Sequence, residues 1–276
     1  MNNVFSLHSG IMDGYKKYIR GFINIQDETI RKTVTDRLLS DTLFPEPLIQ
    51  FNPAFQSGGS IADLIGNGTL HPDSKHIYID DTGAPWNIYR HQADAITLGN
   101  AGKGFVVTSG TGSGKSLTYI TTICNHVLRN PNTNGVCAII VYPLNALINS
   151  QLNALNDFKS KYQKYKKSDF PVTFKRYTGQ EDETQRNEII SNPPHILLTN
   201  YMMLELIMVR HGDKALRDAL LKNLRYLVFD ELHTYKGRQG ADVSLLIRRI
   251  RQTARNKGVI CIGTSATMAS GTIPEQ

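Results

Sequence analysis

The chain has 276 residues, of which 40% are hydrophobic and 20% charged, a composition typical of a soluble globular protein with a sizeable core. It argues against a membrane or secreted protein: no run approaches the roughly 18 consecutive apolar residues of a membrane span, and residues 1–20 lack the pattern of a signal peptide. We therefore expect a cytoplasmic protein, and the net charge of +7 favours a polyanionic partner.

Three cysteines, Cys124, Cys137 and Cys261, are odd in number, widely spaced and embedded in apolar runs. This pattern supports neither a disulfide framework nor a zinc site. We expect buried thiols in reducing surroundings.

The first 80 residues differ in pattern from the rest of the chain. Helical periodicity around residues 30–44 is followed by a passage rich in Pro, Gly and Ser at residues 44–60. We predict a partly helical N-terminal extension, residues 1–80, followed by a domain over residues 81–276.

From Gly104 onward, short β-branched runs alternate with longer helical stretches at residues 115–130 and 144–167. The runs are apolar throughout, as expected of strands buried on both faces of a parallel sheet. This pattern predicts an α/β fold with a mostly parallel sheet flanked by helices. The runs are residues 104–109, 136–142, 172–178, 195–200, 225–230 and 259–265.

The sequence SGTGSGKS, residues 109–116, lies between an apolar run and a helical pattern, which is the setting of a phosphate-binding loop. Its glycines allow backbone N–H groups to converge on phosphate oxygens at the start of a helix. Lys115 is expected to reach the β- and γ-phosphates, and the Ser116 hydroxyl to hold Mg²⁺. The alternative is a glycine-rich turn with a solvated lysine. The predicted phosphate-binding residues are Gly110, Thr111, Gly112, Ser113, Gly114, Lys115 and Ser116.

Two carboxylates, Asp230 and Glu231, follow the apolar run YLVF. At the carboxyl end of a strand in the same sheet as the phosphate loop, they are placed for the Mg²⁺ of a nucleotide. Asp230 is predicted to hold the metal, and Glu231 to orient and deprotonate the attacking water. The alternative is a solvated acidic turn, which is disfavoured because an acidic pair beside YLVF needs a partner to offset its desolvation.

With SGTGSGKS, DELH and SAT in this order, each at a strand end, the chain resembles the first RecA-like domain of superfamily 2 helicases of the DExH type. The resemblance covers about residues 85–269 and implies a P-loop NTPase fold that binds ATP and Mg²⁺. DELHTYKGRQGADVSLLIRRI is similar to MrfA-like bacterial DNA helicases, a group found in DNA repair and phage defence. Ser109 stands where the strict phosphate-loop pattern has Gly, but the helicase form of the motif accepts a small residue there.

The resemblance assigns further residues. IYRHQADAI looks like the glutamine motif, in which Gln92 reads adenine and Tyr89 or Arg90 stacks nearby. YPLNALINSQ looks like a motif that contacts nucleic acid, with Asn145 where common DEAD-box proteins carry Arg. YTGQ and TNYMML stand where two further strand-contacting loops occur. The predicted nucleic-acid residues are Pro143, Leu144, Asn145, Thr178, Gly179, Thr199 and Asn200.

Three residues are predicted to couple the nucleotide site to a neighbouring domain. These are His233 of DELH and the hydroxyls of Ser265 and Thr267 in SAT. A structural histidine and a turn-capping pair of hydroxyls are the alternatives. Two basic segments, residues 159–169 and 246–257, could bind phosphates, but a charge run is more often a solvated face. Trp86 is expected to pack in the core, with contact to adenine as the alternative.

Nothing here resembles the Q-x-x-G-R-x-x-R motif of a second RecA-like domain. The resemblance therefore implies the motor half of an ATP-dependent helicase or translocase, acting on DNA more than RNA, that binds ATP alone but hydrolyses it poorly. A second RecA-like domain is expected elsewhere in the protein or on a partner chain. One alternative is a nucleotide-dependent switch or binding module. A small-molecule phosphotransferase is a weaker one, because it leaves SAT and the glutamine motif without a role.

Overall fold

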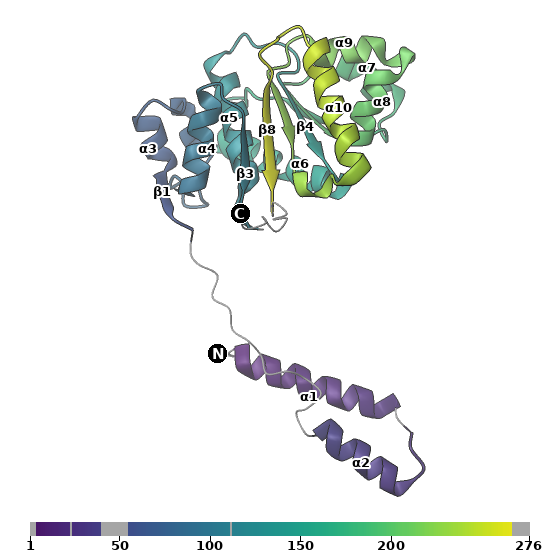
Figure 1. Cartoon of the computed structure of the whole chain (residues 1–276). Coiled ribbons are helices and arrows are strands. Elements are labelled where there is room, and N and C mark those ends of the chain that lie inside the picture. Colours follow the sequence, from purple (N-terminus) through teal and green to yellow (C-terminus); the bar gives the residue numbers. More distant parts are fainter. Residues whose placement is uncertain (1–3, 23, 40–54, 111, 267–276) are drawn as a thin grey trace, which may run out of the picture. The chain divides into compact units, whose positions relative to one another are not determined.

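The structure, a computed structural model, describes residues 4–22, 24–39, 55–110 and 112–266 (Figure 1). It divides into two units, Met1–Ala54 and Phe55–Gln276, each of which has its own internal contacts. The described residues contain no helix that is long and apolar enough to cross a membrane.

The first unit holds two helices, α1 (Val4–Phe22) and α2 (Glu28–Leu39). Asp27 caps α2, because its carboxylate accepts hydrogen bonds from the backbone N–H groups of Thr29 and Ile30, both at 2.9 Å. The helical periodicity at residues 30–44 thus marks a real helix as far as Leu39, beyond which residues 40–54 lie outside the described part. Sequence patterning did not predict α1, whose three glycines lower its helix propensity.

The second unit is built on a six-stranded sheet whose neighbouring strands all run parallel, in the order β3-β8-β7-β4-β6-β5. This confirms the predicted α/β fold. The strands are β3 (Phe105–Thr108), β4 (Ala138–Tyr142), β5 (Phe174–Tyr177), β6 (Ile196–Asn200), β7 (Tyr226–Phe229) and β8 (Ile260–Ser265).

Successive residues of the central strands enter two different cores. Ile140 and Val228 lie in one core, and Ile139 and Leu227 lie in the other, as expected of strands covered on both faces. The first core is covered by α4 (Arg90–Asn100), α5 (Lys115–Arg129) and α6 (Asn145–Lys166). The second is covered by α7 (Glu183–Ser191), α8 (Tyr201–Val209), α9 (Lys214–Leu221) and α10 (Gly237–Thr253), coloured green to yellow in Figure 1. Short 3₁₀ turns, η3 (His211–Asp213) and η4 (Leu232–Thr234), precede α9 and follow β7.

Residues 55–80 pack on the sheet domain, so the boundary between the two units lies before the predicted position at residue 80. Here β1 (Ser57–Ser60) pairs antiparallel with β2 (Asn87–Tyr89), followed by α3 (Ile61–Gly66) and the 3₁₀ turn η2 (Pro72–His76). The difference arises because the apolar side chains of this segment complete the first core. They are Ile61, Leu64, Leu70, Ile77 and Tyr78.

The three cysteines are free thiols, as predicted. Cys124 and Cys137 are buried, and burial raises the pKa of each thiol to about 12. Cys261 is only half-buried.

Candidate nucleotide and nucleic-acid site

The phosphate loop follows β3 and leads directly into α5. Gly112 (φ +77°) and Gly114 (φ +68°) adopt the left-handed conformation that favours glycine, while Thr111 lies outside the described residues. Lys115 is buried, and its Nζ donates hydrogen bonds to the carbonyl oxygens of Ser109 (2.9 Å) and Gly110 (3.1 Å). These bonds hold a buried positive charge at the loop, where the N-terminus of α5 also favours anions.

Gln92 connects the predicted glutamine motif to this loop. Its Nε2 donates to the carbonyl oxygens of Ser113 (3.0 Å) and Gly114 (3.1 Å), and its Oε1 accepts from the backbone N–H of Tyr89 (2.9 Å). Gln92 is buried, so these contacts hold the phosphate loop from the protein interior. Its contact with adenine stays a prediction.

Asp230 follows β7 as a buried carboxylate. The pKa of this carboxyl is raised, mainly because it is buried and in part because the charge of Glu231 lies beside it. The hydrogen bond donated by the Thr264 hydroxyl and the positive charge of Lys115 act in the opposite direction. Because β8 lies between β3 and β7 and all three strands run parallel, the phosphate loop after β3 and the acidic motif after β7 lie at the same edge of the sheet.

Glu231 adopts the left-handed conformation (φ 52°, ψ 53°), which is unfavourable for a residue other than glycine. Its backbone N–H donates to the Thr264 hydroxyl at 3.1 Å. Its Oε2 is buried without a hydrogen bond within the described part of the chain, 3.2 Å from Nδ1 of His233. Strained backbone and an unsatisfied buried carboxylate oxygen are features that cluster at functional sites.

Thr264 is a residue of this site that the sequence analysis missed. Its side chain is fully buried in β8 and bonds both Asp230 and Glu231 of the neighbouring strand. The available signal was a hydroxyl at the end of a strand, immediately before Ser265.

His233 and Ser265, both predicted to couple the site to its surroundings, lie together. Nδ1 of His233 is 3.4 Å from the Ser265 hydroxyl and accepts from the backbone N–H of Ala266 at 3.3 Å. The ends of β7 and β8 are therefore linked by a side chain as well as by their backbones. Thr267 lies outside the described residues.

The donors at this site suit a magnesium ion. Ser116 and Asp230 offer a hydroxyl and a carboxylate, and Mg²⁺ prefers such oxygen ligands. The unbonded Oε2 of Glu231 lies in the same motif as Asp230. Because a cation would stabilise the charged form of Asp230, it would offset the desolvation that raises the pKa of this carboxyl.

A cavity of about 630 Å³ adjoins the phosphate loop at Gly114 and Gln92. Phe55 and Tyr89 line this cavity, and their ring centroids are 5.0 Å apart. Tyr89 also stacks on His91, with ring centroids 5.7 Å apart. Aromatic walls beside a phosphate loop suit a flat base. Tyr89 was predicted here from the glutamine motif, but Phe55 was not. Phe55 lies 34 positions before Tyr89 in the chain and reaches it only because β1 pairs with β2.

Trp86 has two kinds of contact. It packs against the first core, with its ring 5.9 Å from that of Phe158, and it also lines the cavity. The predicted core packing is correct, and the cavity contact is additional.

Residues 89–274 match the family model of DEAD/DEAH box helicases. The chain belongs to the DEAD/DEAH box helicase family. The match spans both predicted nucleotide motifs and Gln92 of the glutamine motif, so this part of the chain is an ATP-dependent helicase domain.

Two of three similar curated proteins are named ATP-dependent helicases. The uncharacterised ATP-dependent helicase YprA of Bacillus subtilis is 31% identical over 66% of this chain and 23% of YprA. The ATP-dependent helicase HRQ1 of Saccharomyces cerevisiae is 31% identical over 67% of this chain and 16% of HRQ1. The Druantia protein DruE of Escherichia coli is 22% identical over 94% of this chain and 20% of DruE. The chain thus spans about a quarter or less of the length of these relatives.

Two solved helicase structures share the fold of this chain. The DUF1998 helicase MrfA bound to DNA superposes with a TM-score of 0.64 at 26% identity, covering 79% of this chain and 27% of MrfA. The helicase Mss116 bound to single-stranded RNA superposes with a TM-score of 0.61 at 18% identity, covering 78% of this chain and 42% of Mss116, which shows a shared fold alone.

Several residues that helicase resemblance assigned to nucleic acid gather at the carboxyl edge of β4, β5 and β6. Asn145 accepts a hydrogen bond from Asn200 at 2.9 Å, which joins the starts of α6 and α8. Leu144 is exposed and Pro143 half-buried at the end of β4. Thr178 and Gly179 follow β5. The structure thus brings the predicted loops to one edge, and their contact with nucleic acid stays a prediction.

Thr199 is placed differently from its neighbours. It is fully buried, and its hydroxyl donates to the carbonyl oxygen of Tyr177 at 2.6 Å. In this conformation the hydroxyl joins β6 to β5 and does not face solvent.

The lysine-rich segment at residues 159–169 packs, in part, against the helicase domain's own surface. Lys161 donates to the carbonyl oxygen of Ile79 at 2.7 Å and lies over the ring of Trp86, and Lys166 pairs with Asp73 at 2.8 Å. These contacts attach the end of α6 to residues 73–86. They favour the structural interpretation of the charge run over phosphate binding.

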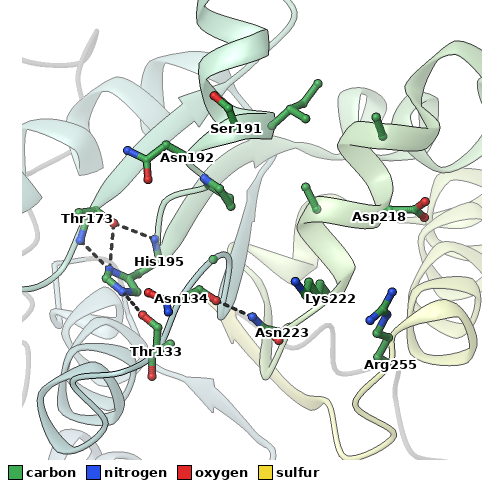
Figure 2. A pocket seen from close by; sticks show the side chains of 15 residues that line it. Thr133, Asn134, Thr173, Ser191, Asn192, His195, Asp218, Lys222, Asn223 and Arg255 are labelled. Atoms are coloured by element: carbon green, nitrogen blue, oxygen red, sulfur yellow. Dashed lines mark hydrogen bonds between the residues drawn. The ribbon is translucent and has the colours of Figure 1, made fainter.

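A second cavity, of about 690 Å³, is lined by residues that precede strands, among them Thr173 before β5 and His195 before β6 (Figure 2). His195 is fixed at its wall: Nδ1 accepts from the backbone N–H of Thr173 (3.0 Å), and Nε2 bonds the carbonyl oxygen of Thr133 (2.8 Å). None of the residues predicted to bind nucleotide or nucleic acid lines this cavity.

Proposed function

We propose that the chain is the ATP-binding motor half of a DNA helicase or translocase. The observation that carries the proposal is the meeting of a buried lysine, a buried aspartate and a strained glutamate at one sheet edge, beside an aromatic cavity. The phosphates of ATP lie on residues 109–116 and its base lies in the cavity lined by Phe55 and Tyr89.

The residues divide the chemistry of ATP hydrolysis between them. Lys115 leaves the carbonyls of its own loop and contacts the β- and γ-phosphates, while Ser116 and Asp230 hold Mg²⁺. When bound, Mg²⁺ neutralises charge that develops on the transferred phosphoryl group. Glu231, whose Oε2 has no hydrogen bond within the described residues, orients the attacking water and accepts its proton.

Efficient turnover requires a second RecA-like domain, in the full protein or on a partner chain. In other phosphoryl-transfer systems an arginine supplied across the cleft accelerates the reaction by about 10³ to 10⁵. The chain alone therefore binds ATP and hydrolyses it slowly.

DNA is favoured over RNA because two solved structures with 26–27% sequence identity to this chain hold DNA, whereas the RNA-bound Mss116 is 18% identical. The crystal structure of MrfA holds DNA, and the structure of Lhr of Mycobacterium smegmatis holds single-stranded DNA and AMP-PNP. The resemblance of DELHTYKGRQGADVSLLIRRI to MrfA-like DNA helicases supports a role in phage defence or in DNA repair.

The test is the ATPase rate of the intact protein with single-stranded DNA, duplex DNA and RNA. We expect DNA to stimulate turnover most.

Lys115→Ala should abolish ATP binding, whereas Lys103→Ala, which changes an exposed lysine just before β3, should not. Glu231→Gln should keep ATP bound and slow its hydrolysis by about 10² or more.

Two outcomes would contradict the proposal. An ATPase that ignores both DNA and RNA would indicate a nucleotide-dependent switch or binding module. Unchanged turnover in Glu231→Gln would show that another residue activates the water.

A further inference from the structure

The loop after β5 contains an anion-binding site that a side chain of the same loop fills. The backbone N–H groups of Thr178 and Gly179 both donate to Oε2 of Glu181, at 2.7 and 2.9 Å, and the Thr178 hydroxyl donates to Oε1 at 3.1 Å. Gly179 has φ +86°, so the two successive amides converge on one point. The Glu181 side chain is only 5% exposed.

This site lies in the row of residues predicted to bind a nucleic-acid strand. Thr178 and Gly179 are themselves two of those residues. Arg176 lies 3.5 Å from Glu181 and also donates to Asn149 of α6 at 2.6 Å, which ties the loop to the helix that begins at Asn145.

Backbone amides cannot distinguish a carboxylate from a phosphodiester, because both present anionic oxygen acceptors. A phosphate can use the two amides only after Glu181 leaves them. A carboxylate that stayed in place would also repel the phosphate and keep Arg176 partly neutralised.

We propose that Glu181 is an internal competitor for one phosphate of the bound strand, and that it sets the affinity of this edge for nucleic acid. The inference rests on the proposed function. When the strand binds, the Glu181 carboxylate turns out to solvent, a phosphate oxygen takes its place on the amides of Thr178 and Gly179, and Arg176 becomes free to pair with the strand.

The test is the affinity of the intact protein for a fluorescent oligo(dT), measured by anisotropy with AMP-PNP and Mg²⁺ at several salt concentrations. Glu181→Gln removes the charge but keeps the size of the side chain. It should bind about three- to ten-fold more tightly than wild type, with a similar salt slope because the same phosphate contacts form in both bound proteins. Glu183→Gln is the matched control, since it removes an exposed charge two residues away and should match wild type.

Unchanged or weaker binding by Glu181→Gln would overturn the inference. It would show that Glu181 only stabilises the conformation of the loop after β5. A structure of the wild-type protein with a bound strand tests the same point without any variant: a phosphate on the two amides supports the competitor, and the carboxylate still in place refutes it. Failure of the wild type to bind any nucleic acid would instead count against the proposed function.

Discussion

At the scale of single residues, one hydroxyl joins the acidic motif of β7 to the end of β8. Thr264 donates to the buried carboxylate of Asp230 and accepts from the backbone N–H of Glu231, which has a strained backbone. It therefore holds the residue predicted to bind the metal and the residue predicted to activate water in a fixed relation. We regard Thr264 as a positioning residue for ATP hydrolysis.

Replacing Thr264 with Val keeps the shape of the side chain and removes both hydrogen bonds. A hydrogen bond to a charged group contributes about 1.5 to 3 kcal/mol, so we expect ATPase activity to fall about ten-fold or more, with a higher Mg²⁺ requirement and little change in ATP binding. Thr122→Val is the control, because it removes an equally buried hydroxyl that bonds only within α5. Equal loss of activity in both variants would show that Thr264 contributes only to core packing and does not position Asp230 and Glu231.

The sequence predicted those site residues that belong to contiguous motifs. Lys115, Asp230 and Glu231 could be assigned because each follows a strand within a short recognisable run. Phe55 and Glu181 could not be assigned, because their roles come from contacts across strand pairs or within a turn whose conformation no short pattern specifies.

At the scale of elements, the strands were predictable because burial on both faces makes them apolar throughout. α1 was not, because its glycines weaken the helical pattern. α5 shows how one element serves two ends of the sheet: its first turn carries Lys115, and its last turn carries His126 against Tyr226, with ring centroids 5.6 Å apart.

His126 should make the stability of the domain depend on pH. Burial, followed by the positive charges of Arg225 and His195, lowers its pKa from the ordinary 6.5 to about 4. The unfolded chain therefore binds a proton between pH 6.5 and pH 4 that the folded chain does not, so the free energy of unfolding falls as pH decreases through this window. His126→Gln should flatten that dependence in urea unfolding at pH 4.5, 5.5 and 7, whereas a variant of the exposed His211 should keep it. A slope unchanged by His126→Gln would contradict this assignment.

At the scale of the whole molecule, the sheet domain begins before the glutamine motif and includes residues 55–80. This segment contributes to the first core and, through Phe55, to the cavity beside the phosphate loop. Its composition predicted an extension, because Pro, Gly and Ser are frequent at residues 44–60, where the segment begins. Its packing instead depends on contacts with α5 and α6, which are distant in sequence.

Two truncations test whether the sheet domain begins at residue 55 or at residue 81. Removing residues 1–54 should leave a domain that unfolds cooperatively and binds ATP, because the segment removed is a unit with its own contacts. Removing residues 1–80 deletes five buried apolar side chains of the core. Burial of each contributes about 1.5 to 3 kcal/mol, and the total is comparable to the roughly 5 to 15 kcal/mol by which a domain is stable. The shorter chain should therefore fail to fold, as measured by circular dichroism and urea unfolding. Cooperative unfolding of residues 81–276 would move the boundary back to residue 80, and loss of folding in both truncations would show that the first unit is required as well.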